Sequence, residues 1–149
     1  MKTSIKWTEV TQACVNISNK VKKNKIDIIV AVSRGGLIPA RLIAKHLKIR
    51  RIYSLGMESY SDDTNKANEI NIYQSFTEKF PKNCNILVVD DIVDKGTSLR
   101  HALNNIGMNR TESATVISCA IHYKKCSIIK PDVFYKEVDE NNWIIYPWE

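Results

Sequence analysis

The sequence has few cysteines and no long apolar run, and these absences exclude several classes of protein. Its 149 residues include four cysteines and three histidines. No two cysteines form a CxxC pair and no two histidines stand at zinc-ligand spacing, so we expect reduced thiols and no structural zinc site. No apolar run approaches the roughly 20 residues that cross a bilayer. Residues 1–8 lack the apolar core of a secretory signal peptide, and we therefore expect a cytoplasmic protein.

Internal repeats, low-complexity segments and a helix-turn-helix pattern are also missing. The remaining composition, with 44% hydrophobic and 26% charged residues, is typical of a soluble globular protein. A chain of this length predicts one domain over residues 1–149. Its formal net charge of +6 suits an anionic substrate or a nucleic acid, and the charge alone does not choose between them.

Segments with strand and helix periodicity alternate along the chain, which predicts an α/β fold with a mostly parallel sheet flanked by helices. Thr8 is expected to cap the first helix. The apolar face of that helix carries Val10, Ala13, Cys14, Ile17 and Val21. Further helices are expected at 37–47 and 99–107. Strands are expected at 26–32, 49–57, 70–76, 86–89, 113–123 and 133–135.

The strongest signal for function lies in residues 86–99. The first four are apolar without alternation, as expected of a strand that is covered on both faces. Asp90 and Asp91 follow, then the polar loop 94–98, and then a helical pattern. A strand-to-helix turn needs one capping carboxylate, whereas three carboxylates within five residues repel each other unless a cation or hydroxyl groups hold them. The acidic pair therefore suits Mg²⁺ or sugar hydroxyls, and the loop at the helix N-terminus suits a phosphate.

Polar clusters also follow other expected strands. Residues 33–36 read Ser-Arg-Gly-Gly; the two glycines let an anion approach backbone N–H groups, and Arg34 offers a guanidinium fork. Residues 59–60 and 122–125 end two further strands. Taken singly, each cluster also fits a plain turn or a solvated charge. Because ligands of α/β sheets bind at the carboxyl ends of the strands, we expect these clusters to share one site.

Residues 86–99 resemble the signature of type I phosphoribosyltransferases, enzymes that use phosphoribosyl diphosphate (PRPP). That signature is an apolar strand, two acidic residues, two apolar residues, Asp, and a loop rich in glycine and hydroxyl groups. Residues 31–39, the Ser-Tyr dipeptide 59–60 and the ending 143–149 are similar to the bacterial xanthine–guanine (6-oxopurine) phosphoribosyltransferases and their archaeal-type relatives. The resemblance covers most of the chain in the same order and is weakest in the first helix and in 61–82.

The resemblance implies a role for each part of the acidic stretch. Asp90 and Asp91 would hold the ribose hydroxyls and the Mg²⁺ of PRPP. Asp94 would lie near the purine N7 and act as general base. The 5′-phosphate would be wrapped by Asp94, Lys95, Gly96, Thr97 and Ser98. The family usually has Thr or Ser where this chain has Lys95, so a hydroxyl donor is exchanged for an ammonium that points either at the phosphate or away from it.

The resemblance also implies a diphosphate site and a small hood. Ser33, Arg34 and Gly35 would bind the diphosphate, with a cis peptide bond expected between Ser33 and Arg34. The polar stretch at about 61–69 would be a mobile hood that closes over the reaction and excludes water, with Lys66 in reach of the diphosphate. The plain alternative for this stretch is a disordered surface loop.

The purine site is implied at the end of the chain. Lys124 would donate to the purine O6 and so reject adenine, whose exocyclic amine is itself a donor, and Lys125 is the alternative. Trp143 would lie against the purine ring, although buried tryptophans usually belong to cores. The main chain of Ile144 would meet the base edge, whereas Trp148 is assigned to packing.

Together these features predict a cytoplasmic purine-salvage enzyme that uses Mg²⁺. PRPP and guanine, xanthine or hypoxanthine would give GMP, XMP or IMP, together with diphosphate. The C-terminal segment at about 133–149 would form the purine site. The preferred base is left open. The resemblance implies a homodimer or homotetramer, with no nucleic acid as partner. The alternatives are a PRPP-sensing regulator that binds nucleic acid and a phosphoribosyltransferase for another base.

Overall fold

The structure, a computed structural model, describes residues 1–60, 69–111 and 113–149. The expected hood at 61–69, with Lys66, lies outside the described residues apart from Glu69. Within the described ranges, no helix is both long enough and apolar enough to cross a membrane.

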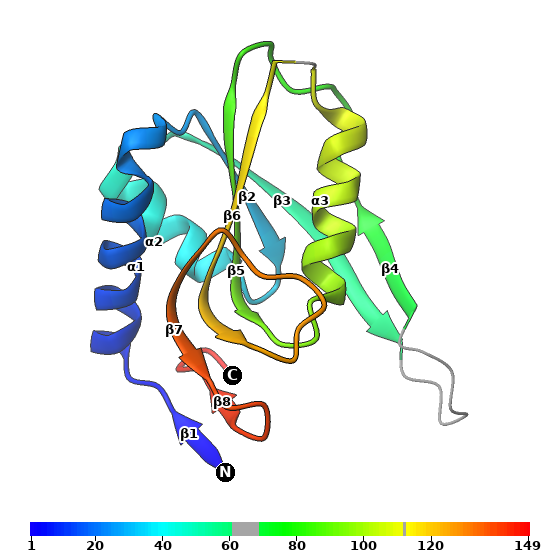
Figure 1. The fold of residues 1–149 in the computed structure, drawn as a ribbon. Coiled ribbons are helices and arrows are strands. Elements are labelled where there is room, and N and C mark those ends of the chain that lie inside the picture. The colour runs from blue at the N-terminus through cyan, green and yellow to red at the C-terminus, as the bar shows by residue number, and fades with distance from the viewer. Residues whose placement is uncertain (61–68, 112) are drawn as a thin grey trace.

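A six-stranded sheet forms the centre of the molecule (Figure 1). Its strand order is β4-β3-β2-β5-β6-β7, and every neighbouring pair is parallel except β3 and β4. The predicted α/β class with a mostly parallel sheet is confirmed. The strands are β2 (Ile28–Ser33), β3 (Arg51–Tyr60), β4 (Glu69–Gln74), β5 (Asn85–Val93), β6 (Thr115–Lys124) and β7 (Val133–Val138).

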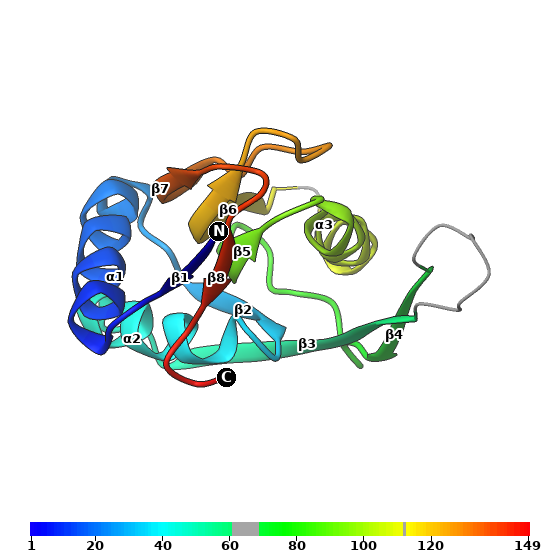
Figure 2. The same cartoon turned by 90° about the horizontal axis from the view of Figure 1, so that it is seen from below.

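Helices cover both faces of this sheet, as Figure 2 shows from below. They are α1 (Trp7–Val21), the short 3-10 helix η1 (Lys22–Asn24), α2 (Leu37–Leu47) and α3 (Thr97–Asn109). Because side chains alternate along a strand, each strand supplies two cores. Ile29 and Ala31 of β2 pack with α1 and α2, whereas Ile28 and Val30 belong to the core under α3.

A second, two-stranded parallel sheet joins the two ends of the described chain. Strand β1 (Lys2–Ser4) pairs with β8 (Trp143–Ile145), and Trp143 N donates to Met1 O at 2.8 Å. In Figure 1 this small sheet lies at the end of the molecule to which β2, β6 and β7 point. The C-terminal stretch therefore packs, as predicted, whereas the polar sequence of residues 1–8 gave no sign of β1.

Several predicted boundaries are wrong by a few residues, and two of them have a clear cause. The expected cap Thr8 lies inside the first turn of α1, because the extended residue Lys6 (φ −90°, ψ 155°) precedes Trp7 and is the N-cap. The Trp7 ring packs on Trp148 with centroids 5.8 Å apart, a long-range contact that no local pattern shows. The strand expected at 86–89 continues to Val93, because β6 pairs with it beyond its last pairing with β2 at Val89. The acidic pair thus belongs to the last part of β5.

Candidate active site

The candidate site lies where β2 and β5 end side by side. After β2 the chain crosses to β3 on one side, and it later returns to β5 on the other side of β2. Ligands of open α/β sheets bind at such a switch point, outside the carboxyl ends of the strands. A Cβ at Gly35 would overlap the carboxylate of Asp91. The turn after β2 therefore lies directly against the acidic pair of β5.

The turn after β2 has the backbone that the sequence predicted. The Ser33–Arg34 peptide bond is cis, as expected, and the Arg34 side chain is exposed. A Cβ at Gly36 would overlap the carbonyl oxygen of Val89, so the backbone approaches β5 more closely than any other residue allows. Helix α2 begins at the next residue, Leu37. A guanidinium and the positive end of a helix are thus presented at one turn.

Asp90 and Asp91 are buried carboxylates, only 8% and 9% exposed. The backbone orients both, because Asp91 N donates to Asp90 Oδ1 at 2.9 Å and Ile92 N donates to Asp91 Oδ1 at 2.7 Å. Burial raises the pKa of both carboxyls above the ordinary value, and the charge of Asp91 raises the pKa of Asp90 further. A cation or hydroxyl donors would relieve this cost, so the pair suits a ligand that brings them.

Residues 94–98 form a tight turn that ends in a helix N-terminus. Gly96 is the N-cap of α3, with φ +83°, and a Cβ on it would overlap Ser127 Oγ. Left-handed backbone and lack of space both require glycine here. Thr97 and Ser98 lie half-buried in the first turn of α3. Hydroxyls, backbone N–H groups and the positive helix end therefore meet at one place, which suits a phosphate.

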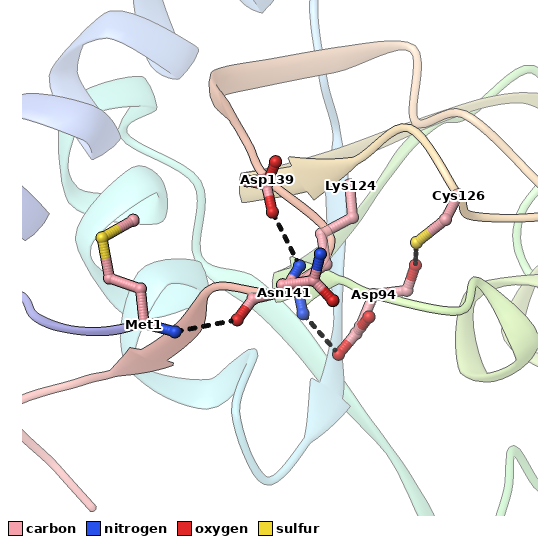
Figure 3. Close-up of polar contacts among 6 residues, drawn as sticks. All are labelled: Met1, Asp94, Lys124, Cys126, Asp139 and Asn141. Atoms are coloured by element: carbon pink, nitrogen blue, oxygen red, sulfur yellow. Dashed lines mark hydrogen bonds and ion pairs between the residues drawn. The ribbon is translucent and has the colours of Figure 1, made fainter.

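The loop after β6 supports this turn from outside. The carbonyl oxygen of Lys95 accepts a hydrogen bond from Ile128 N at 3.0 Å, and Cys126 Sγ lies 4.0 Å from Asp94 O (Figure 3). The side chain of Lys95 is exposed. The loop after β6 thus holds the backbone of the turn, and the exposed Lys95 ammonium is accessible both to solvent and to an anion.

Lys124 and Asp94 form an ion pair across the site, with Nζ and Oδ2 3.0 Å apart (Figure 3). Lys124 is 5% exposed although it carries a charge, whereas 46% of the Asp94 side chain is exposed. Lys125 extends into solvent and pairs with Glu137 at 3.1 Å. The sequence left open whether Lys124 or Lys125 contacts the purine. Lys124 is the one that reaches the loop 94–98, called the phosphate loop below.

Strand β8 presents an exposed aromatic ring. Trp143 is 61% exposed, so it is not the core residue that most tryptophans are, and Ile144 beside it is buried. An exposed, flat ring is available to a planar ligand. Trp148 instead stacks on Tyr146, with centroids 4.6 Å apart and 6° between the planes. The assignment of Trp148 to packing is confirmed.

Two buried polar residues beneath the acidic pair were missed by sequence reasoning. Tyr146 Oη donates to Asp91 O at 2.9 Å, and His122 Nδ1 lies 2.7 Å from the same Oη. Burial lowers the pKa of His122 to about 4, and the charge of Lys136 adds to the shift. The only signal in the sequence was the Tyr146 hydroxyl within an apolar C-terminal stretch. Such a hydroxyl is expected to be buried and therefore to need a hydrogen-bond partner.

The described residues supply only part of a metal-binding shell. In 1–60, 69–111 and 113–149 no group of three or more His, Cys, Asp or Glu side chains could hold a metal ion. Mg²⁺ takes about six oxygen ligands and is commonly bound by one or two carboxylates together with substrate phosphates and water. Asp90 and Asp91 fit that arrangement, provided that the ligand contributes oxygens of its own.

Comparison with known proteins identifies the family to which this chain belongs. The xanthine-guanine phosphoribosyltransferase of Idiomarina loihiensis is 26% identical over 146 residues, which cover 97% of this chain and 85% of that protein. The purine phosphoribosyltransferase structure from Pyrococcus horikoshii is 24% identical with a TM-score of 0.88, covering 99% of this chain and 94% of that one. A hypothetical protein from Neisseria gonorrhoeae with bound ppGpp is 26% identical with a TM-score of 0.84, covering 100% and 90%. The phosphoribosyl transferase domain family matches residues 6–149. Because that match spans nearly the whole chain, the protein belongs to the phosphoribosyl transferase family.

Proposed function

We propose that the protein is a purine-salvage enzyme that transfers the phosphoribosyl group of PRPP to guanine, xanthine or hypoxanthine. The products are GMP, XMP or IMP and diphosphate. The observation that carries the proposal is the Lys124–Asp94 ion pair, because it joins the phosphate loop after β5 to a buried cation at the end of β6. The relative from Idiomarina loihiensis, named for xanthine and guanine, supports this substrate class.

PRPP would span the turn after β2 and the loop 94–98 after β5. Its 5′-phosphate would lie in the loop 94–98, at the N-terminus of α3. Its diphosphate would lie at Ser33, Arg34 and Gly35, where the guanidinium pairs with phosphate oxygens. Support comes from the close approach of Gly35 to Asp91, since one ligand can then contact the turn after β2 and the acidic pair of β5.

Asp90 and Asp91 would hold Mg²⁺ and the ribose hydroxyls. Their burial and raised pKa favour a partner that carries positive charge or donates hydrogen bonds. When bound, the ion neutralises charge that develops on the departing diphosphate.

The purine would lie between Lys124 and β8. Lys124 would donate to O6, Trp143 would stack on the ring and the main chain of Ile144 would meet the base edge. An ammonium has three donors, so Lys124 can bind O6 while it keeps Asp94 in place. The ion pair therefore aligns the carboxylate with the base that it is to deprotonate.

The transfer itself exchanges one bond at the ribose C1. The bond to the diphosphate oxygen breaks, the purine N9 bonds to C1, and the ribose passes through an oxocarbenium-like state. Asp94 accepts the proton that the purine loses at N7. The half-exposed position of Asp94 lets this proton pass on to solvent after the reaction.

We also infer a cytoplasmic location and a homodimer or homotetramer, as the resemblance to the 6-oxopurine branch implies. Nucleic acid is not expected as a partner. The cytoplasmic location also follows from the proposed salvage role, since PRPP and free bases are soluble metabolites.

The proposed reaction is tested by its products. Purified protein is mixed with PRPP, Mg²⁺ and one base at a time: guanine, xanthine, hypoxanthine, adenine or uracil. We expect one nucleoside monophosphate and one diphosphate for each 6-oxopurine consumed. Release of diphosphate with adenine or uracil, and with none of the 6-oxopurines, would assign the enzyme to another base. Absence of release with every base, together with salt-sensitive binding of RNA or DNA, would support the regulator instead.

A further inference from the structure

Tyr146, in the C-terminal stretch, contacts the backbone of the acidic pair. Tyr146 directly follows β8 and is 2% exposed. Its ring stacks on Trp148, and its hydroxyl donates to the carbonyl oxygen of Asp91 at 2.9 Å. The segment that carries Trp143 and Ile144 is therefore tied to strand β5, which carries the acidic pair.

The hydrogen bonds at the Tyr146 hydroxyl have a defined direction. The carbonyl of Asp91 can only accept, so the hydroxyl proton points to it. His122 Nδ1, 2.7 Å from the same oxygen, must then be the donor. The imidazole is neutral at physiological pH, because burial lowers its pKa to about 4. The result is a buried chain from His122 Nδ1–H to Tyr146 Oη–H to Asp91 O.

The peptide group at the end of this chain also holds the Asp91 carboxylate. Its oxygen belongs to Asp91 and its N–H to Ile92, and that N–H donates to Asp91 Oδ1 at 2.7 Å. A peptide group is planar, so an anchor on its oxygen sets the direction of its N–H. The register between β2 and β5 ends at Val89, and Tyr146 thus contacts β5 beyond the last pairing with β2.

We propose that Tyr146, supported by His122, is a positioning residue that sets the orientation of the Asp91 carboxylate from the purine-binding segment. The inference rests on the proposed function, in which Asp91 binds PRPP. Neither Tyr146 nor His122 touches a reacting atom. Loss of the tyrosine hydroxyl therefore weakens PRPP binding and leaves the chemical step and the purine contacts nearly unchanged.

The substitution Tyr146→Phe tests this, because it removes one hydroxyl and keeps the ring that stacks on Trp148. We expect the KM for PRPP to rise about three- to tenfold, the effect of one net hydrogen bond. The kcat and the KM for guanine stay within about twofold, because the contacts of the base are kept. Tyr53→Phe on β3, whose ring packs on Phe76 and Phe80 away from the site, is the control and leaves all three constants unchanged.

His122 supplies a second variant with its own outcome. His122→Leu removes the donor and raises the KM for PRPP, whereas His122→Asn keeps a donor near the position of Nδ1 and restores most of the affinity. The double variant His122→Leu/Tyr146→Phe shows the same KM for PRPP as Tyr146→Phe alone, because His122 acts through the hydroxyl. Additive effects of the two substitutions on the KM for PRPP would contradict the proposed hydrogen-bond chain from His122 through Tyr146 to Asp91.

Calorimetric binding of PRPP with Mg²⁺ to the wild type and to Tyr146→Phe separates this inference from the proposed function. Weaker PRPP binding by the variant supports the inference, whether or not the wild type turns over guanine. Equal binding overturns it and leaves the proposed function intact. A parallel loss of kcat, purine affinity and melting temperature in Tyr146→Phe would also overturn it, since the tyrosine would then be a general packing residue.

Discussion

Among single residues, Lys124 and Asp94 form the ion pair that carries the proposed function. An ammonium that is only 5% exposed is costly without a partner, and Asp94 Oδ2 provides one at 3.0 Å. The exposure is unequal, because nearly half of the Asp94 side chain meets solvent. One partner is thus fixed and the other is accessible, which is the arrangement expected of a base that exchanges a proton with a ligand.

Replacement of Asp94 by Ala or Asn tests this at the residue scale. Loss of a general base typically lowers turnover by about two to four orders of magnitude, and we expect kcat to fall by that amount. Steady-state kinetics at saturating PRPP and guanine measures it. Glu137→Gln, which removes the charge that pairs with the surface residue Lys125, is the matched control and leaves kcat unchanged. A kcat close to wild type in both Asp94 variants would contradict the role.

His122 predicts a pH dependence of stability. Its pKa falls from 6.5 to about 4 on folding because the imidazole is buried. Between these values the unfolded chain binds a proton that the folded protein does not, so the free energy of unfolding decreases as the pH falls. The contribution of one proton is about 1.4 kcal/mol per pH unit at most. Urea denaturation across this range should show a weaker dependence in His122→Asn than in the wild type, and equal slopes would contradict the assignment.

At the scale of elements, the site is formed by turns that leave no room for a Cβ. Gly35 and Gly36 bring the turn after β2 against β5, and Gly96 brings the phosphate loop against the loop after β6. The strands determine where these turns start, and the glycines determine how closely the turns approach β5 and the loop after β6. The geometry of the candidate site is therefore a property of neighbouring strand ends as much as of their side chains.

Gly96 and Gly107 distinguish the need for glycine at a crowded turn from a general effect of replacing glycine by alanine. Gly96→Ala meets both a positive φ and the Ser127 side chain, so we expect a loss of about 1–3 kcal/mol in unfolding free energy and a raised KM for PRPP. At Gly107, inside α3, an added Cβ would meet nothing within 4 Å, and Gly107→Ala should gain about 0.5–1 kcal/mol with unchanged kinetics. Thermal and urea unfolding check both. Equal stability of the two variants would contradict the account.

Local sequence pattern was sufficient for some of these elements and not for others. Helix α2 has the bounds that were predicted, because a glycine turn precedes it and its apolar spacing ends at Leu47. The cis peptide bond after Ser33 and the strand-end acidic pair followed from motifs that are contiguous in sequence. By contrast, β1 and the support of Asp91 by Tyr146 join residues far apart in the chain. Contacts of that kind decide packing and leave no periodic signal.

At the scale of the whole molecule, both ends of the described chain meet at one end of the main sheet. Strand β1 pairs with β8 (Figure 1), and β8 carries the exposed residue Trp143. The chain as a whole carries a formal net charge of +6. PRPP carries several negative charges, whereas guanine is neutral, so the overall field favours one substrate and not the other.

This difference predicts unequal salt dependence of the two substrates. As ionic strength rises from about 0.01 to 0.15 M, the Debye length falls from about 30 to 8 Å, and kcat/KM for PRPP should decrease. The kcat/KM for guanine at saturating PRPP should stay nearly constant over the same series. Steady-state kinetics in potassium chloride measures both. An equal salt effect on the neutral base would show that the field of the molecule is not the cause.

We propose above that Lys124 and Asp94 together recognise and deprotonate the base of a 6-oxopurine phosphoribosyltransferase. The most direct test is the ratio of kcat/KM for guanine to that for adenine, measured in the wild type, Lys124→Met and Lys125→Met. We expect the wild type to favour guanine by about 10⁴ or more, because a donor facing O6 rejects an amine. Lys124→Met should lower kcat/KM for guanine by about 10- to 100-fold and narrow the ratio, while Lys125→Met leaves it unchanged. Equal use of guanine and adenine by the wild type, or a narrowed ratio in Lys125→Met alone, would contradict the account.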